Sequence, residues 1–119
     1  MHWKIYHNPR CSKSRQALQM LRDNGIEPRI VEYLKNPPSA AEVLELMHMA
    51  PGPARDLLRT DDAAFRESGI DPDAVDTAAL AEAVGREPRL LQRPIVVCGQ
   101  RAVIGRPPEA IRTLLEAQP

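Results

Sequence analysis

The sequence is short of aromatic residues, of cysteine and of any excess charge. It contains one Trp, two Tyr and one Phe in 119 residues, which offers little for the base stacking that single-stranded nucleic-acid binding uses. Sixteen Lys and Arg balance sixteen Asp and Glu, so bulk charge gives no support to nucleic-acid or membrane binding. Two cysteines and three scattered histidines are also a poor basis for a metal site such as zinc.

Long apolar runs and internal repeats are missing as well. No run approaches the roughly 20 apolar residues that a membrane span needs, and residues 1–8 are typical of a strand rather than a signal peptide. From these absences we expect a cytoplasmic protein whose two cysteines, Cys11 and Cys98, stay reduced. The length favours a single domain over residues 1–119. The sequence does not settle the oligomeric state, and we expect a monomer by default.

The order of predicted elements favours an α/β fold. Lys4–His7 and Arg29–Leu34 are typical of strands, and a helix that begins at Ser12 or Ser14 and ends at Asn24 lies between them. Because the connection between the two strands is a crossover, they should be parallel neighbours.

A helical insertion over residues 36–90 is predicted to follow. Ser39 and Glu42 form a capping box that opens its first helix. Further helical segments are predicted over 54–59, from a cap within 60–62 to Gly69, and over 77–84.

After the insertion, the apolar run Pro94–Cys98 is typical of a buried central strand, and Gly99-Gln100 turns the chain into the partner strand Arg101–Ile104. A last helix carries Ile111 and Leu114 on its apolar face. A βαβ half and a ββα half around one mixed sheet give the order of a thioredoxin-like fold.

Cys11 is the sharpest chemical feature of the sequence. It lies in the turn Asn8-Pro9-Arg10-Cys11, after a predicted strand and before a predicted helix. Free backbone N–H groups and the helix dipole stabilise an anion at that position, and Arg10, Lys13 and Arg15 add positive charge. We therefore expect a thiol pKa below about 8.5 and a thiolate nucleophile near neutral pH.

The residues after Cys11 exclude two chemistries. Ser14 stands where a dithiol redox motif has its second cysteine, so the site is monothiol and an outside thiol must resolve it. A phosphatase loop needs arginine six positions after the cysteine, where this chain has Ala17. Two compatible roles are open for Ser14: it donates to the thiolate, or it caps the helix.

Three arginines in boundary positions are candidates for binding a tetrahedral oxyanion, because a guanidinium recognises such groups in bidentate fashion. They are Arg59, Arg93 and Arg106. In a thioredoxin-like sheet the start of the Pro94 strand lies beside the cysteine loop, and a cis Arg93–Pro94 bond is suspected there. The alternative is that these are ordinary surface arginines.

Three further residues near the site have weaker signals. His7, at the end of the first strand, either tunes Cys11 or is a structural hydrogen-bonding group. Asn8 is expected to fix the turn through its side chain. Cys98 ends an apolar strand and is interpreted as a small core residue rather than a resolving thiol.

The motifs I-Y-H-N-P-R-C-S-K-S-R-Q at 5–16, L-L-R at 57–59, Q-R-P-I-V-V at 92–97 and I-G-R-P-P-E at 104–109 resemble those of a known family. It is the glutaredoxin-dependent arsenate reductase family, which also contains the Spx regulators. The resemblance extends from Lys4 to Leu115. It implies that Cys11 is the catalytic cysteine, that Arg59, Arg93 and Arg106 hold the oxyanion, and that His7 lowers the pKa of Cys11.

The resemblance also implies a reaction and its partners. The Cys11 thiolate would attack arsenic(V), glutathione would then attack the adduct, and glutaredoxin would reduce the mixed intermediate and release arsenite. Glutathione would be a co-substrate, with no tightly bound cofactor. Asn8, Ser14, Arg15 and Pro94 would support the site.

This chain departs from the well-studied members beside the nucleophile. Those enzymes have a small residue before the cysteine and a Gly-Thr pair after it, where this chain has Arg10 and Ser12-Lys13. These changes leave two alternatives open. One is a monothiol redox protein that acts on another thiol or oxyanion. The other is an Spx-like regulator that binds RNA polymerase, although such regulators typically use a Cys-x-x-Cys switch that Ser14 removes.

Overall fold

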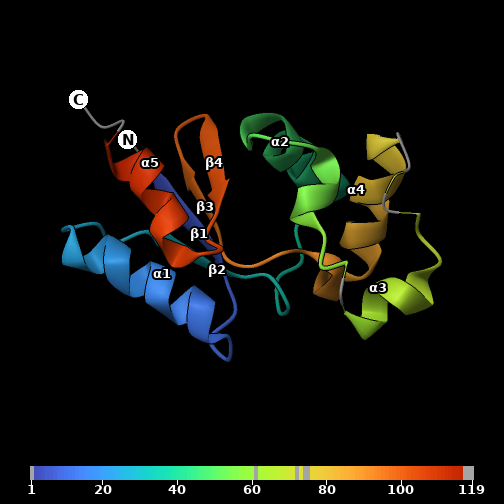
Figure 1. Cartoon of the computed structure of the whole chain (residues 1–119), viewed down its shortest axis with the longest axis horizontal. Helices are drawn as coiled ribbons and strands as arrows, with labels where there is room; N and C mark the ends of the chain where they lie inside the picture. Colours follow the sequence, from blue (N-terminus) through green and yellow to red (C-terminus); the bar gives the residue numbers. More distant parts are fainter. Residues whose placement is uncertain (1, 61, 72, 74–75, 117–119) are drawn as a thin grey trace. The chain divides into compact units, whose positions relative to one another are not determined.

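A four-stranded mixed sheet is the framework for Cys11 in the computed structural model, which describes residues 2–60, 62–71, 73 and 76–116 (Figure 1). The strands lie in the order β2-β1-β3-β4. Their bounds are β1 Trp3–His7, β2 Arg29–Glu32, β3 Ile95–Cys98 and β4 Arg101–Ile104. β1 is parallel to β2 and antiparallel to β3, and β3 is antiparallel to β4. This topology confirms the predicted thioredoxin-like fold.

The register of the sheet brings the end of β1 beside the start of β3 and the end of β4. Tyr6 lies opposite Ile95, and Ile95 lies opposite Ile104. All four residues of β3 are buried, as expected for an apolar run in a central strand. The residues that follow β1, precede β3 and follow β4 therefore share one edge of the sheet.

The chain divides into two compact units, and the first contains the sheet. This sheet unit comprises residues 1–36 and 93–119. It also holds α1 (Ser12–Asp23) and α5 (Arg112–Glu116), the latter preceded by a 3₁₀ turn over Pro108–Ile111. The buried face of α1 packs with β-strand side chains and with Ile111 and Leu114 in one apolar core.

One boundary and one helix type in the sheet unit differ from the sequence prediction. β2 ends at Glu32 rather than Leu34, because the backbone N–H groups of Lys35 and Asn36 both donate to the Glu32 carbonyl and turn the chain. The last helix begins as a 3₁₀ turn at Pro108, at the first turn where a missing N–H costs least.

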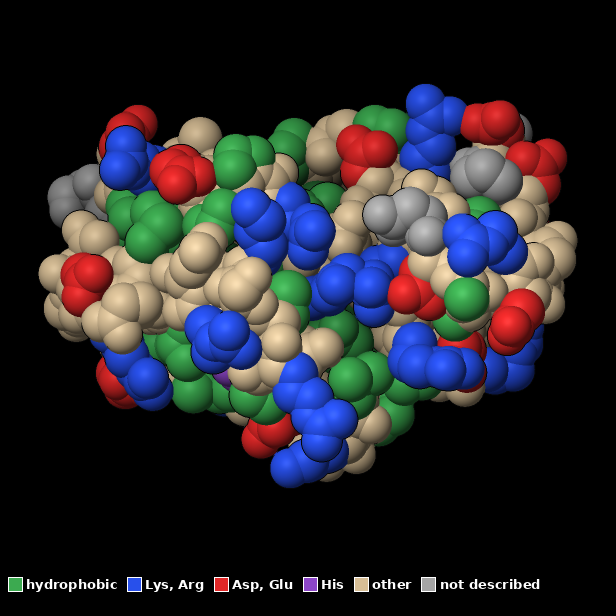
Figure 2. All heavy atoms as spheres, turned by 60° about the horizontal axis from the view of Figure 1, so that its bottom comes forward, with side chains coloured by type: hydrophobic (Ala, Val, Ile, Leu, Met, Phe, Trp, Pro, Cys, Tyr) green, Lys and Arg blue, Asp and Glu red, His purple; other side chains and the backbone are tan. Residues whose placement is uncertain are grey.

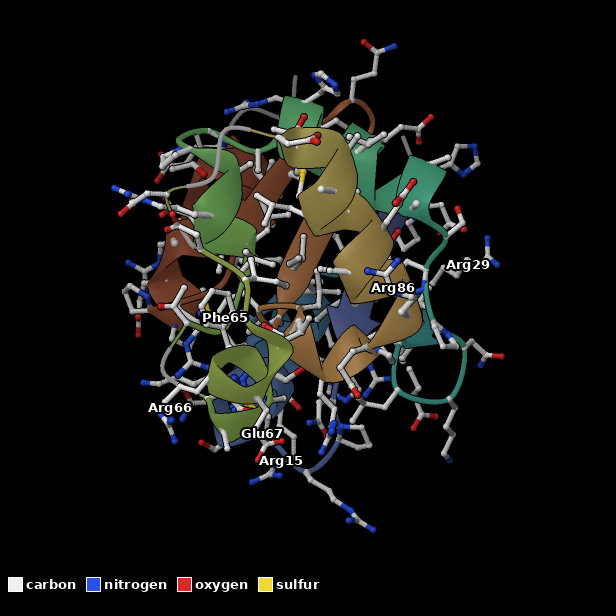
Figure 3. The ribbon with its side chains drawn as sticks, turned by 90° about the vertical axis from the view of Figure 1, so that its right-hand side faces the viewer. Arg15, Arg29, Phe65, Arg66, Glu67 and Arg86 are labelled. Carbon is white, nitrogen blue, oxygen red and sulfur yellow. The ribbon has the colours of Figure 1, made fainter. Side chains whose placement is uncertain are left out.

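The second unit, here called the helical unit, comprises residues 37–92. Its α-helices are α2 (Ala40–Met49), α3 (Ala63–Ser68) and α4 (Thr77–Arg86), with 3₁₀ turns over Ala54–Leu57 and Pro88–Leu90. α2 and α4 pack against each other. On α3, Phe65 is buried while Arg66 and Glu67 project outward (Figure 3).

The helices of this unit begin with conventional caps. Ser39 and Glu42 form the predicted capping box of α2. The Asp62 carboxylate accepts from the Ala64 backbone N–H at the start of α3, and Asp76 accepts from the Ala79 N–H at the start of α4. Each cap satisfies an otherwise orphan donor and places negative or partial negative charge at the positive end of the helix.

The two units carry opposite net charge, which the balanced total conceals. The sheet unit has eleven Lys and Arg against five Asp and Glu, a formal charge of +6. The helical unit has five against eleven, a formal charge of −6. Lys and Arg side chains are prominent on the face shown in Figure 2. The balanced composition therefore does not describe the surroundings of Cys11.

Candidate active site at the start of helix α1

The loop between β1 and α1 is held in a fixed turn by its own hydrogen bonds. The Asn8 side-chain Oδ1 accepts from the Arg10 backbone N–H at 3.0 Å, and the Asn8 carbonyl accepts from the Cys11 N–H at 3.0 Å. The Arg15 guanidinium donates to the Pro9 carbonyl at 2.9 Å. This turn places Cys11 at the N-cap of α1, directly before its first residue, Ser12.

Cys11 is the N-cap residue of α1, and its side chain makes no capping hydrogen bond to a backbone N–H. The thiol is half-buried, and burial by itself would raise its pKa. The backbone N–H of Ser14, the positive charge of Arg93, the backbone N–H of Lys13 and a hydrogen bond from the Arg93 side chain act in the opposite direction. The outcome is a pKa of Cys11 below that of a free thiol, which favours the nucleophilic thiolate.

Arg93 and Arg106 come together because β3 and β4 form a hairpin whose open end lies at the site edge. Arg106 Nη1 donates to the Arg93 carbonyl at 3.2 Å. The Gly105 N–H donates to the Pro94 carbonyl at 2.9 Å, and a Cβ on Gly105 would lie 2.8 Å from Pro94 Cγ. A side chain at 105 would therefore push apart the two segments that carry the arginines.

Both arginines precede cis peptide bonds. The suspected cis Arg93–Pro94 bond is present, and Arg106–Pro107 is a second one that the sequence analysis did not anticipate. Arg93 is half-buried and Arg106 is exposed.

His7 makes its contact with Ser14 rather than with the thiol. The His7 Nδ1 and Ser14 Oγ atoms are 2.6 Å apart, and both side chains are buried. Ser14 Oγ also accepts from the Asn8 backbone N–H at 3.0 Å. Ser14 thus ties the end of β1 to the first turn of α1.

The charge of His7 follows from this packing. Burial lowers the pKa of His7, Glu32 raises it, and Arg22 and Arg15 lower it, with a lowered pKa as the outcome. A neutral ring satisfies the contact if Ser14 donates its hydroxyl hydrogen to Nδ1. The Ser14 hydroxyl contacts His7 and the Asn8 N–H rather than capping α1. The backbone N–H of Ser14 is the group that acts on Cys11.

Arg59 lies in the helical unit, where a short antiparallel bridge fixes its backbone. Leu58 pairs with Leu91, and the Arg59 N–H donates to the Leu90 carbonyl at 2.8 Å. The Arg59 side chain forms an ion pair with Asp62 at 3.0 Å, a partner that the sequence analysis missed although it lies three residues ahead. Within the described residues, the buried Nε of Arg59 has no hydrogen-bond acceptor.

The remaining candidates lie away from the thiol. Cys98 is a buried, free cysteine in the core of the sheet unit. A surface hollow of about 430 Å³ lies at the opposite end of α1, between Met20 and Leu115, and it touches none of the predicted site residues.

In the described part of the chain, no three His, Cys, Asp or Glu side chains gather as a metal site. No helix in this part has the length and apolarity to cross a membrane.

The sequence is similar to known proteins over almost its whole length. The sequence matches the ArsC family over residues 6–114. It is 42% identical to an arsenate reductase of Neisseria meningitidis over 113 residues, covering 94% of this chain and 97% of that protein. It is 43% identical over 109 residues to the uncharacterized protein YfgD of Escherichia coli K12, covering 91% and 92%.

A solved structure gives the same result. An arsenate reductase from Vibrio cholerae superimposes with a TM-score of 0.88 at 37% sequence identity, covering 99% of this chain and 98% of that one. The family match includes Cys11, Arg59, Arg93 and Arg106 within its span. The family match and these similarities show that the chain, with Cys11 at the start of α1, belongs to the ArsC family.

Proposed function

We propose that this protein reduces arsenate to arsenite, with Cys11 as the nucleophile. The observation that carries the proposal is the position of Cys11 at the start of α1, where backbone N–H groups and Arg93 lower the pKa of its thiol. Membership of the ArsC family and similarity to proteins named arsenate reductase support arsenate as the substrate.

The reaction begins with a bond between sulfur and arsenic. The Cys11 thiolate attacks arsenic(V), and an arsenate oxygen leaves as water after protonation. Glutathione then adds its own sulfur to arsenic and a second water leaves. Finally a glutaredoxin thiolate attacks the glutathione sulfur, the electron pair of that sulfur–arsenic bond passes to arsenic, and arsenic(III) results. Water then releases arsenite and regenerates the Cys11 thiolate.

Arg93 and Arg106 are proposed as oxyanion ligands, and their positions support this role. Arg93 acts on the thiol, and Arg106 is held against the Arg93 carbonyl. Guanidinium groups beside the attacking sulfur would hold arsenate and offset the charge that develops during attack. Both are therefore proposed as substrate-binding and catalytic residues.

Arg59 is proposed as the third oxyanion ligand. Its buried Nε lacks an acceptor among the described residues, and its backbone is fixed to the segment Leu90–Gln92, which leads directly into Arg93 in the sequence. Its ion pair with Asp62 leaves guanidinium donors available for a ligand.

The supporting residues act on the shape of the Cys11 loop. His7 and Ser14 fix the start of α1 against β1, and Asn8 and Arg15 fix the turn. Pro94 packs closely against Gly105, which follows β4. Because glutathione is a cytosolic thiol, the proposal includes a cytoplasmic location, and we propose a monomer without a tightly bound cofactor.

The test is arsenite production by the purified protein with arsenate, glutathione and glutaredoxin. We expect turnover that needs both reductants and is lost in Cys11→Ser, since no other thiol lies at the site. Cys98→Ser, which changes the other cysteine, serves as the control and should retain turnover. Activity in Cys11→Ser, or equal loss in Cys98→Ser, would contradict the role of Cys11.

A further inference from the structure

Arg10 and Lys13 flank the nucleophile in sequence, and no carboxylate among the described residues pairs with their charges. Arg10 immediately precedes Cys11 and Lys13 follows it by two positions. Both side chains are exposed. Over the described residues, no carboxylate forms an ion pair with either of them, whereas Arg22, Arg55, Arg59 and Arg89 each have one.

The position is unfavourable for the helix. The N-terminus of a helix is its positive end, so a cation in the first turn is destabilising and an anion is stabilising. α1 has no acidic residue in its first turn. α2, in contrast, has Glu42 in its first turn. Two cations at the start of α1 therefore act against helix stability, and sites that break such a local rule are commonly functional.

The thiol pKa does not explain the two side chains either. The positive side chain that lowers the pKa of Cys11 is Arg93, while Lys13 contributes through its backbone N–H. Arg15, the next cation along α1, is already engaged with the Pro9 carbonyl. The charges of Arg10 and Lys13 are thus left facing solvent beside a reactive sulfur atom.

We propose that Arg10 and Lys13 bind the carboxylates of the thiol or disulfide that reacts with Cys11, and so select an anionic reductant. The proposal rests on the thiol chemistry of the proposed function. A guanidinium pairs with a carboxylate through two parallel hydrogen bonds, and an ammonium adds a point charge. A small peptide thiol with free carboxylates, of which glutathione is one example, fits these groups. The +6 charge of the sheet unit adds long-range attraction.

Thiol–disulfide exchange tests the reaction of Cys11 with an anionic partner in the absence of arsenate. The Cys11 thiolate attacks one sulfur of a disulfide, a new sulfur–sulfur bond forms, the old one breaks, and the leaving thiolate takes a proton from water. No other oxidant is needed. The rate is followed by the mass of the protein or by the thiol released.

The experiment compares the rates at which Cys11 reacts with three small disulfides of similar size and different charge. Dithiodiglycolate is anionic, 2-hydroxyethyl disulfide is neutral and cystamine is cationic. Oxidised glutathione serves as the peptide probe. With Cys98→Ser as background, we expect the anionic probes to react fastest. In Arg10→Glu/Lys13→Glu the ratio of the anionic to the cationic rate should fall by roughly tenfold or more, because rim charges act on association rates.

A matched control carries the same charge change elsewhere on the sheet unit. Arg29 lies at the start of β2 and Arg101 at the start of β4, both at the end of the sheet opposite to His7, and Figure 3 shows Arg29 well apart from Arg15 at the start of α1. Arg29→Glu/Arg101→Glu should leave the ratio within about twofold of the parent, since exposed charges far apart are screened. Taking ratios cancels any change in the thiolate fraction.

The outcomes separate this inference from the proposed function. Loss of anion preference in Arg10→Glu/Lys13→Glu alone supports the inference, even if arsenate is not turned over. An unchanged ratio, or an equal fall in the control, overturns it even if arsenate reduction is robust. Salt gives a second readout: the preference of the parent should weaken between low and high ionic strength, and a preference independent of salt would contradict it.

Discussion

The helices of the two units begin in opposite ways. In the helical unit, α2, α3 and α4 start with Ser39, Asp62 and Asp76, each accepting a hydrogen bond from a backbone N–H. In the sheet unit, α1 starts with Cys11, which makes no such bond, and continues with Lys13 and without an acidic residue in its first turn. The first arrangement stabilises a helix, whereas the second leaves its positive end available to an anion.

These two kinds of helix start show that capping groups stabilise the fold in the helical unit, whereas the start of α1 in the sheet unit serves the thiol. Orphan N–H groups at a helix start are satisfied by caps where only folding is at stake. At α1 they act on a sulfur atom instead and lower its pKa. The net charges of +6 and −6 follow the same division between the sheet unit and the helical unit.

The largest effect should come from removing Arg93, whose charge and side-chain hydrogen bond act on the thiol. Arg93→Ala should lower kcat for arsenate by about 100- to 1000-fold, the usual loss when a preorganised transition-state donor is deleted. It should also raise the pKa of Cys11, since the guanidinium charge and hydrogen bond that lower it are lost. Arsenite production and the pH dependence of iodoacetamide alkylation measure the two effects.

Arg101→Ala is the matched control for this change, because Arg101 is exposed at the turn end of the same hairpin. It should leave both the turnover and the alkylation profile unchanged. If Arg93→Ala alkylates with the parental pH profile, the electrostatic role of Arg93 is wrong.

The next effect concerns the link between β1 and α1. Ser14→Ala removes the hydroxyl that bonds His7 Nδ1 at 2.6 Å and accepts from the Asn8 N–H at 3.0 Å. Because His7 and Ser14 are buried, we expect a loss of about 1–3 kcal/mol in the free energy of unfolding. Urea titration measures it. Ser12→Ala, at an exposed neighbour, should change stability by less than about 0.5 kcal/mol.

A smaller effect tests the conventional start of α2. Glu42→Lys removes the capping-box partner of Ser39 and puts a cation at the positive helix end, so we expect a loss of about 1 kcal/mol in the free energy of unfolding. Glu45→Lys makes the same charge change one turn later at an exposed position and should cost clearly less. Equal losses would mean that net charge, not the cap, decides.

Most of the fold could be predicted because its signals are local. The apolar run of β3, the Gly99-Gln100 turn and the Ser39–Glu42 box each define an element within a few residues. The ends of elements were less predictable: β2 stops at Glu32 because a turn competes for its carbonyl, and α5 starts as a 3₁₀ turn. These outcomes depend on hydrogen-bond competition that no residue pattern records.

The candidate site was predictable as a set of residues but not as a set of contacts. The strand–turn–helix context was enough to identify Cys11 as a helix-start thiol. The pairing of Ser14 with His7 needs β1 and α1 already packed together, and the contact of Arg106 with the Arg93 carbonyl needs the β3–β4 hairpin. Such contacts arise from tertiary closure, so sequence spacing did not predict that the Ser14 hydroxyl contacts His7.

The smallest expected effect comes from making the first turn of α1 resemble the acidic first turn of α2. Lys13→Glu replaces a cation by an anion in the first turn, so we expect a gain of about 0.3–1 kcal/mol in the free energy of unfolding. The same carboxylate disfavours the neighbouring thiolate, so the pKa of Cys11 should rise and alkylation at neutral pH should slow. Lys13→Gln, which only removes the charge, should gain less stability than Lys13→Glu and should alkylate like the parent, because Lys13 lowers the pKa of Cys11 through its backbone N–H. If Lys13→Glu lost stability, or gained it without slowing alkylation, helix stability and the thiolate would not be opposed at the start of α1.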